Sequence, residues 1–390
     1  MVNSMLKLFG NIKNHIFDDN LFVNPIKIST NSNLPNVLKK TYAYLIKDNN
    51  YSDGFFHYIV FNDFYEKNKE ILETKSYSII SDDFKYLSND DIVSINPNQN
   101  KIRVLFRSHS DFNSILVTEQ CNHYCLMCSQ PPKSKDDSYL LDEIENLIPL
   151  IPRYTKEIGF TGGEPTTNRD RFLKILRLTK SYLPETSIHI LSNGRSFRDF
   201  RFAKSYADLE LADSMVGIPL YSDDPSLHNY IVQADNAFDE TVQGIINLKK
   251  LNQKVEIRIV LHKLSIERLI QLCEFIGRNL LFVDHVALMG LEIIGFTRAN
   301  LQELWIDPFD YKDKLSQATF ILKSYGLNAS IYNHQLCVVN ENVWPFCRQS
   351  ISDWKNEFAI ECQTCTKRCD CGGFFSSGLL YKHSDHLHSL

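Results

Sequence analysis

The sequence contains no long apolar run. Among its 390 residues, no stretch approaches the roughly 18 consecutive apolar residues that a membrane-spanning helix needs. Residues 1–20 also lack an apolar core of signal-peptide length, because polar residues interrupt it early. These absences argue against a helical membrane anchor and a secretory signal, so we expect a cytoplasmic protein with no membrane partner.

The chain also lacks a strong excess of charge of either sign. Lys and Arg together number 42 and Asp and Glu 47, which gives a net charge of −5. We therefore expect no general affinity for nucleic acid. Hydrophobic residues make up 43%, an ordinary value for a chain that buries a substantial core. No low-complexity linker divides the sequence, whose length suits one large domain with an appendage or two domains.

Cysteine is unevenly distributed. Of the ten cysteines, three lie within 121–128 and five within 347–371, while Cys273 and Cys337 stand apart. Cytoplasmic thiols stay reduced, so a disulfide framework is not expected. Clusters of this kind indicate metal sites instead.

From about Phe112 onward, strand-like apolar runs alternate with segments of helix length. Six β/α units in succession indicate an α/β fold with a parallel sheet, either open and doubly wound or closed into a full or partial barrel. In both, the chemistry lies at the carboxyl ends of the strands. The strands are expected at Ser114–Thr118, Glu157–Thr161, Ile188–Ser192, Met215–Leu220, Val255–Leu261 and Val283–Met289, and the helices at Leu141–Ile151, Asp170–Tyr182, Phe200–Leu209, Phe238–Leu251 and Ile266–Arg278.

Two further regions flank this pattern. Residues 1–110, with strand-like stretches at Tyr58–Phe61 and Lys101–Phe106, predict a small accessory domain of mixed type. After a helix at Phe309–Tyr325 and a strand near Asn328–Tyr332, a cysteine-rich tail begins, and we expect it to pack on the α/β body.

The first cysteine group directly follows the first predicted strand. Cys121, Cys125 and Cys128 have the spacing C-x3-C-x2-C. Cysteine thiolates are the usual ligands of iron–sulfur clusters, and three of them leave one iron of a cubane open for another ligand. A structural zinc site needs four ligands, and His123 is available as the fourth. Both occupants remain open from the spacing alone.

Polar or glycine-rich turns follow the later strands. Gly162-Gly163-Glu164 follows the second strand, where backbone can approach a ligand and a carboxylate can hold an ammonium group. Ser192-Asn193 follows the third strand and Ser222 the fourth, and ordinary turn chemistry is the alternative explanation for Ser192-Asn193. On the fifth strand, alternation places Glu256 and Arg258 on one face, where Arg258 binds a ligand carboxylate or joins a cross-strand ion pair.

These motifs together resemble those of the radical SAM (S-adenosylmethionine) superfamily, over roughly residues 112–300. The resemblance implies a partial (β/α)6 TIM-like barrel at 111–305, with a small N-terminal α+β domain at 1–110 and a Cys-rich C-terminal extension at 306–390. It implies that the first three cysteines hold a 4Fe–4S cluster on which SAM is cleaved to a 5′-deoxyadenosyl radical. The residues implied to bind SAM are Tyr124, Gly162, Gly163, Glu164, Ser192, Asn193, Ser222 and Arg258.

The tail is similar to the auxiliary-cluster extensions of peptide-modifying radical SAM enzymes. Cys362, Cys365 and Cys371 form C-x2-C-x5-C, Cys347 is a fourth ligand candidate, and Cys369 is surplus. The resemblance implies one auxiliary 4Fe–4S cluster, with zinc as the rival occupant because four thiolates also satisfy zinc.

Three segments resemble the His-Xaa-Ser system radical SAM maturases in particular, namely Thr118–Lys133, Ser350–Trp354 and Cys371–Phe375. That resemblance implies a ribosomally made precursor peptide as substrate, a partner radical SAM maturase, and an electron donor such as flavodoxin or ferredoxin. Residues 1–110 are then expected to help recognise the peptide. The alternatives are a radical SAM enzyme acting on a small metabolite or RNA, and a non-catalytic zinc or iron–sulfur scaffold.

Overall fold

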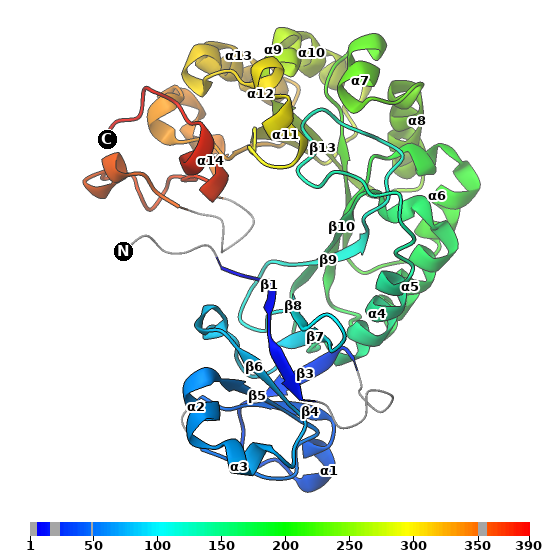
Figure 1. The fold of residues 1–390 in the computed structure, drawn as a ribbon. Helices are drawn as coiled ribbons and strands as arrows, with labels where there is room; N and C mark the ends of the chain where they lie inside the picture. The colour runs from blue at the N-terminus through cyan, green and yellow to red at the C-terminus, as the bar shows by residue number, and fades with distance from the viewer. Residues whose placement is uncertain (1–5, 16–23, 48–49, 350–356) are drawn as a thin grey trace.

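The computed structural model describes residues 6–15, 24–47, 50–349 and 357–390 (Figure 1). An N-terminal sheet packs beside a larger sheet, whose helices form an arc along its outer side, and the C-terminal extension lies across from part of that arc. Within the described residues, no helix is both long and apolar enough to cross a membrane.

Among the described residues, the N-terminal sheet has eight strands in the order β1-β8-β7-β3-β4-β5-β6-β2. Three short helices, α1 (Asn36–Lys39), α2 (Asn62–Lys67) and α3 (Lys69–Leu72), accompany it. The prediction of a mixed α+β region is confirmed by these elements. The strands are β1 (Phe9–Asn11), β2 (Lys13–His15), β3 (Ile26–Ser29), β4 (Tyr42–Leu45), β5 (His57–Phe61), β6 (Tyr77–Ile80), β7 (Ile92–Asn96) and β8 (Lys101–Phe106).

One short stretch of chain joins the two ends of this sheet. β1 and β2 lie at opposite ends of the strand order, yet only Ile12 separates them in the sequence. β1 pairs with β8 and β2 pairs with β6, and both pairings are antiparallel. The sheet therefore curls into a small barrel, and Ile12 is buried in one of its apolar clusters.

The two faces of the N-terminal strands pack into separate clusters, as strand alternation requires. On β5, Ile59 belongs to the cluster that contains Ile12. Its neighbours Tyr58 and Val60 belong to a second cluster, which Phe64 of α2 and Leu72 of α3 complete.

The larger sheet has eight parallel strands in the order β16-β15-β14-β13-β12-β11-β10-β9. In the described residues β9 and β16 stand at its two ends, so the sheet is not closed, and the predicted partial barrel is confirmed. The six predicted strands are β9 to β14, and β15 and β16 extend the sheet. Their bounds are β9 (Asn113–Thr118), β10 (Glu157–Gly162), β11 (Ser187–Leu191), β12 (Ser214–Pro219), β13 (Lys254–Leu261), β14 (His285–Gly290), β15 (Ala329–Tyr332) and β16 (Cys347–Arg348).

Helices connect these strands and continue beyond them. The α-helices are α4 (Tyr139–Leu147), α5 (Arg169–Tyr182), α6 (Phe200–Ala207), α7 (Pro225–Val232), α8 (Ala237–Lys250), α9 (Lys263–Glu267), α10 (Leu269–Asn279), α11 (Phe296–Ala299), α12 (Leu301–Leu304), α13 (Lys312–Ser324) and α14 (Ser376–Tyr381). The 3-10 helices are η1 (Asp82–Phe84), η2 (Ile148–Leu150), η3 (Pro165–Thr167), η4 (Arg195–Arg198), η5 (Pro308–Tyr311), η6 (Leu336–Val338), η7 (Glu341–Phe346) and η8 (Ile360–Gln363).

Helix α7 was not among the predicted helices. The Asp224 side chain accepts a hydrogen bond from the Ser226 N–H, and Pro225 occupies the first turn. An aspartate cap followed by proline is a common helix start, so the signal was present in the sequence.

The main apolar core extends across all three parts of the chain. It includes Ile92 and Phe106 of the N-terminal sheet, Ile115 of β9, and Cys347 and Cys371 of the C-terminal region. The N-terminal and C-terminal regions therefore pack into the core of the larger sheet.

Candidate active site

A cavity of about 640 Å³ extends from the start of β9 to the loops that follow the strands of the larger sheet. Its wall includes 104–107 of the N-terminal region and Phe375 at the start of α14. The fold therefore gathers all three parts of the chain around one space. The predicted site residues that line it are Cys121, Cys125, Cys128, Gly162, Gly163, Ser192, Asn193 and Arg258.

The loop that carries the three cysteines follows β9 and is held from two sides. The Leu126 N–H donates to the Ile231 carbonyl of α7 at 2.9 Å, and the Phe296 N–H of α11 donates to the Cys128 carbonyl at 2.9 Å. Within the loop, the Cys128 N–H donates to the Cys125 carbonyl at 2.9 Å. These bonds fix the loop backbone, while the cysteines line the cavity.

Gly295 allows the close approach of α11 to this loop. Its φ is +55°, a left-handed conformation that favours glycine. A Cβ at this position would lie 2.3 Å from the Cys128 carbonyl oxygen and 2.7 Å from that of Ser129. A larger residue would therefore displace the cysteine loop.

The thiols are better suited to metal ligation than to nucleophilic attack. Burial raises the pKa of Cys121 to about 12, and the charges of Glu164 and Cys128 add to this effect. Burial, then the neighbouring Cys128 and Cys121, also raises the pKa of Cys125, and burial raises that of Cys128. A nucleophilic cysteine needs a lowered pKa, whereas a metal deprotonates its thiol ligands outright.

The three cysteines are the residue type that holds an iron–sulfur cluster, and they line one cavity. In the described residues, no group of three or more His, Cys, Asp or Glu side chains is arranged to hold a metal ion. A cubane makes a different demand, because each of its thiolates binds a separate iron. His123 lines the same cavity, with its Nδ1 4.0 Å from the Cys125 Sγ, and its buried Nε2 has no hydrogen-bond partner among the described residues. Burial lowers the pKa of His123 to about 3, so its imidazole is neutral.

The glycine turn after β10 lies against the start of the cysteine loop. The Gly163 N–H donates to the Thr118 carbonyl and the Glu164 N–H to the Gln120 carbonyl, both at 2.8 Å. Two motifs that are distant in the sequence thus share backbone hydrogen bonds, and Gly162 and Gly163 line the cavity.

The Glu164 carboxylate faces protein donors. It accepts hydrogen bonds from the Thr166 N–H at 3.0 Å, the Ser192 hydroxyl at 2.8 Å and the Asn193 N–H at 2.6 Å. Burial raises its pKa, and these hydrogen bonds oppose the rise. Glu164 is not among the described residues that line the cavity, so the side chain joins the turns after β10 and β11.

Two other predicted contacts lie away from the cavity lining. The Tyr124 side chain is 52% exposed, and Ser222 is fully buried, where its hydroxyl accepts a hydrogen bond from the Asp224 N–H at 3.0 Å. Neither is among the described residues that line the cavity. Their proposed role in binding a cofactor gains no support from these positions.

Glu256 and Arg258 share a face of β13, as predicted. The Arg258 Nη1 donates to the Glu256 Oε1 at 2.6 Å. The ion pair therefore lies within one strand rather than between two. Arg258 still lines the cavity, which places a cationic side chain in the same cavity as the thiols.

The C-terminal cysteines gather near β16 and η8. Cys347 and Cys371 are buried, Cys362 and Cys365 are partly buried, and Cys369 is exposed. Burial raises the pKa of Cys347 to about 12, and the neighbouring Cys371 adds to it. Burial also raises the pKa of Cys362, to which Cys371 and Cys365 contribute. The structure therefore brings the predicted auxiliary ligands into one region.

Cys337 belongs to this region, although its isolation in the sequence gave no such signal. It lies on η6, and burial, then the charges of Cys371 and Cys365, raises its pKa. The Gln335 amide beside it donates to the Gly373 carbonyl at 2.6 Å. Cys337 is a further candidate ligand that only the tertiary structure reveals.

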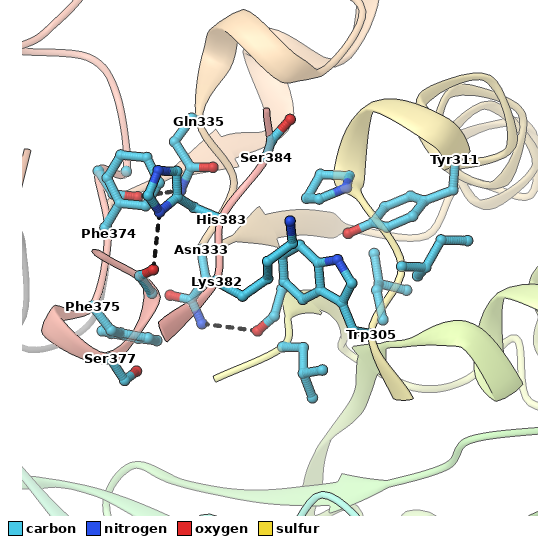
Figure 2. Close-up of a pocket in the computed structure, with 18 residues that line it drawn as sticks. Trp305, Tyr311, Asn333, Gln335, Phe374, Phe375, Ser377, Lys382, His383 and Ser384 are labelled. Carbon is cyan, nitrogen blue, oxygen red and sulfur yellow. Dashed lines mark hydrogen bonds between the residues drawn. The ribbon is translucent and has the colours of Figure 1, made fainter. Parts of the chain in front are cut away.

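A smaller cavity of about 50 Å³ marks where the C-terminal extension meets the larger sheet (Figure 2). Trp305 and Tyr311 lie on one side, with Phe374 and His383 on the other. Phe375 lines both cavities, so the docking of the extension also positions one wall of the larger space.

Fold and site together define an α/β partial-barrel protein with a thiol-lined cavity at its strand ends. Residues 115–276 match a family model described as the Radical SAM superfamily. This range contains the three-cysteine loop and the Gly162–Glu164 turn. This part of the chain is therefore similar to the radical SAM superfamily.

Solved structures with a related arrangement have low sequence identity to this chain. SuiB from Streptococcus suis bound to S-adenosylmethionine is 16% identical, with 63% of this chain and 53% of that chain covered and a TM-score of 0.46. SuiB bound to the precursor peptide SuiA is also 16% identical, with 59% and 49% covered and a TM-score of 0.44. Native anSMEcpe with bound AdoMet is 16% identical, with 56% and 62% covered and a TM-score of 0.45. The chain spans about half the length of the SuiB structures, and the comparison with curated proteins gives no match.

Proposed function

We propose that this chain is a radical SAM enzyme that modifies a ribosomally made peptide. The observation that carries the proposal is a single cavity lined by the thiols of Cys121, Cys125 and Cys128, the backbone of Gly162 and Gly163, and Arg258. These groups come from the loops after β9 and β10 and from within β13. Their convergence supports a site for a cluster and SAM together.

Each part of the site has a separate task in this proposal. The three thiolates would hold a 4Fe–4S cluster, and Arg258 would attract the carboxylate of the methionine part of SAM. Ser192 and Asn193 would lie along the rest of the cofactor. When bound, the reduced cluster and SAM supply a one-electron cleavage that releases methionine and a 5′-deoxyadenosyl radical able to take a substrate hydrogen atom. The enclosing wall excludes water from that reaction.

The substrate that we propose is a precursor peptide of the His-Xaa-Ser type, with a partner radical SAM maturase and a flavodoxin or ferredoxin as electron donor. The motif runs at 118–133 and 371–375 support this assignment, while the third run at 350–354 lies outside the described residues. The modest net charge of −5 favours a peptide over RNA. We place the reaction in the cytoplasm, where thiols stay reduced.

We also propose an auxiliary 4Fe–4S cluster in the C-terminal extension. Cys362, Cys365 and Cys371 are its candidate ligands, with Cys347 or Cys337 as the fourth. The proximity of their thiols supports this site. Iron and zinc analysis of anaerobically purified protein distinguishes the cluster from the zinc alternative.

Anaerobic reconstitution tests the main proposal. With dithionite, the wild-type protein should convert SAM to 5′-deoxyadenosine, and Cys125→Ala should lose this activity together with about four irons per chain. Cys273→Ala removes a buried thiol on α10 and serves as the matched control, with full activity expected. A wild-type protein that binds iron but cleaves no SAM would identify a scaffold instead.

The auxiliary site has its own test. Cys365→Ala should retain some SAM cleavage without substrate but yield no modified peptide when the precursor is co-expressed. Cys369→Ala, which changes an exposed thiol outside the candidate ligand set, is the control. Full peptide modification by Cys365→Ala, measured by mass spectrometry, would contradict the auxiliary role.

A further inference from the structure

A layer of polar side chains crosses the larger sheet from β11 to β15. It consists of His189 on β11, Glu256 and Arg258 on β13, His285 on β14 and Ser330 on β15. A radical SAM reaction at the cysteine loop gives no task to Glu256 or either histidine. Polar side chains are costly to bury unless each is paired.

Glu256 is the centre of the layer and is 5% exposed. Its Oε1 accepts from the Arg258 Nη1 at 2.6 Å, and its Oε2 accepts from the His285 Nδ1 at 2.7 Å. The other ring nitrogen of His285 lies 3.0 Å from the Ser330 hydroxyl, which donates to it when Nδ1 carries the proton. Burial opposes ionisation of Glu256, but the His285 hydrogen bond and the Arg258 charge prevail and lower its pKa to about 2. The carboxylate is therefore ionised and holds one edge of the guanidinium.

The other edge of Arg258 has a much weaker partner. Its Nη2 donates to the Met289 Sδ at 3.1 Å, and a thioether is a poor acceptor for a charged donor. Arg258 and Met289 both line the large cavity, as do the three cysteines. A carboxylate entering the cavity could replace the thioether with a far stronger acceptor.

A glycine on the neighbouring strand β12 leaves space for the side chains of Arg258 and His189. A Cβ on Gly217 of β12 would lie 3.0 Å from the Arg258 Cδ and 3.1 Å from the His189 Nε2. Glycine at this position lets both long side chains lie across β12. The conformation of Arg258 thus depends on residues from several strands.

We propose that Glu256 and His285 are positioning residues that present the Nη2 edge of Arg258 to the carboxylate of SAM. Glu256 fixes the opposite edge of the guanidinium, and His285 fixes Glu256. The inference rests on the proposed function, since it takes SAM as the ligand of the cavity. In this proposal Glu256 and His285 orient Arg258 together, a role that neither residue shows by itself.

The test compares the affinity of anaerobically reconstituted protein for SAM and for decarboxylated SAM, measured by equilibrium dialysis. Arg258→Leu should weaken SAM binding about tenfold to a hundredfold and leave decarboxylated SAM within about threefold of wild type. Glu256→Leu should weaken SAM binding about tenfold with the same selectivity. Glu256→Gln should stay within about threefold, because its amide oxygen still accepts from Arg258.

Controls separate positioning from folding. Tyr206→Phe removes a buried hydrogen bond, at 3.0 Å to Ser214, outside the cavity lining and should leave both affinities unchanged. If Glu256→Leu does not fold, His285→Leu keeps the ion pair and should weaken SAM binding about threefold, again without affecting decarboxylated SAM.

Two results would overturn the inference: equal losses for both ligands in a folded Glu256 or His285 variant, or wild-type SAM affinity in Glu256→Leu. Failure of the wild-type protein to bind SAM at all would instead reject the proposed function.

Discussion

At the scale of single residues, two buried carboxylates organise the polar interior. Glu164 accepts four hydrogen bonds from the turns after β10 and β11, two of them from Thr166. Glu256 is held by Arg258 and His285 on the inner face of the sheet. Each carboxylate accepts hydrogen bonds from buried donor groups, which would be costly to leave unpaired. Their replacement should therefore affect stability as well as ligand binding.

Glu164→Gln should lower the free energy of unfolding by about 1–3 kcal/mol, because the new amide N–H group faces backbone donors. Urea denaturation measures this effect. Glu185→Gln changes an exposed glutamate in the loop between α5 and β11 and should be neutral. Equal stability of the two variants would contradict a structural role for the Glu164 carboxylate.

The low pKa of Glu256 predicts a pH dependence. The carboxyl has a pKa of about 2 in the fold and about 4.3 when unfolded. Its contribution to stability is therefore complete above about pH 5 and is lost as the pH falls toward 2. Relative to Glu256→Gln, the wild-type protein should lose about 3 kcal/mol over that range. Parallel pH profiles of unfolding for the two proteins would show that the carboxylate is not stabilised by its partners.

At the scale of elements, the cysteine loop depends on its neighbours for shape. Its carbonyls and N–H groups bond to α7 and α11, and Gly295 sets the distance to α11. The loop has little regular structure of its own. Cluster loading should therefore be sensitive to changes outside the cysteines.

Gly295→Ala should reduce the iron bound after reconstitution, because its Cβ would press on the Cys128 carbonyl. Gly326→Ala is a matched control, since Gly326 also has a positive φ but has nothing within 4 Å of the added Cβ. Both changes carry backbone strain, and only the first adds a clash. Iron content per chain measures the difference, and equal loading would show that the contact is unimportant.

At the scale of the whole molecule, the N-terminal sheet is part of the core. Phe106 of β8 is 2% exposed and belongs to the main apolar cluster, whereas Phe64 of α2 belongs to a cluster confined to the N-terminal region. The same strand also contributes to the cavity wall. Removal of residues 1–110 would therefore expose part of the core.

Phe106→Ala should destabilise the larger sheet and its helices by about 3–5 kcal/mol. Phe64→Ala should have a similar cost that stays local to the N-terminal sheet. Hydrogen exchange of β9 and β10 distinguishes the two, with faster exchange expected only for Phe106→Ala. Protection of β9 and β10 that is unchanged in Phe106→Ala would mean that the two sheets unfold independently.

Short-range patterns in the amino-acid sequence were enough to predict the strands of the larger sheet and much of the candidate site. Short apolar runs that alternate with helix-length segments predicted six strands of the parallel sheet. The positions of the cysteines, Gly162–Gly163 and Ser192–Asn193 after strands predicted that these residues meet at one end. Such signals are local, because a parallel strand is a short apolar run and a ligand loop has a short spacing. Topology then brings the strand ends together without further information.

Contacts between distant residues were decided only by the tertiary structure. The hydrogen bonds of Glu164, the hydrogen bond between Glu256 and His285, and the place of Cys337 beside Cys371 each join residues with no shared pattern along the chain. Tyr124 and Ser222 show the converse, since motif position suggested contacts that burial and exposure do not support. A spacing tells which residues follow a strand, but side-chain packing across neighbouring strands determines which of them face the cavity.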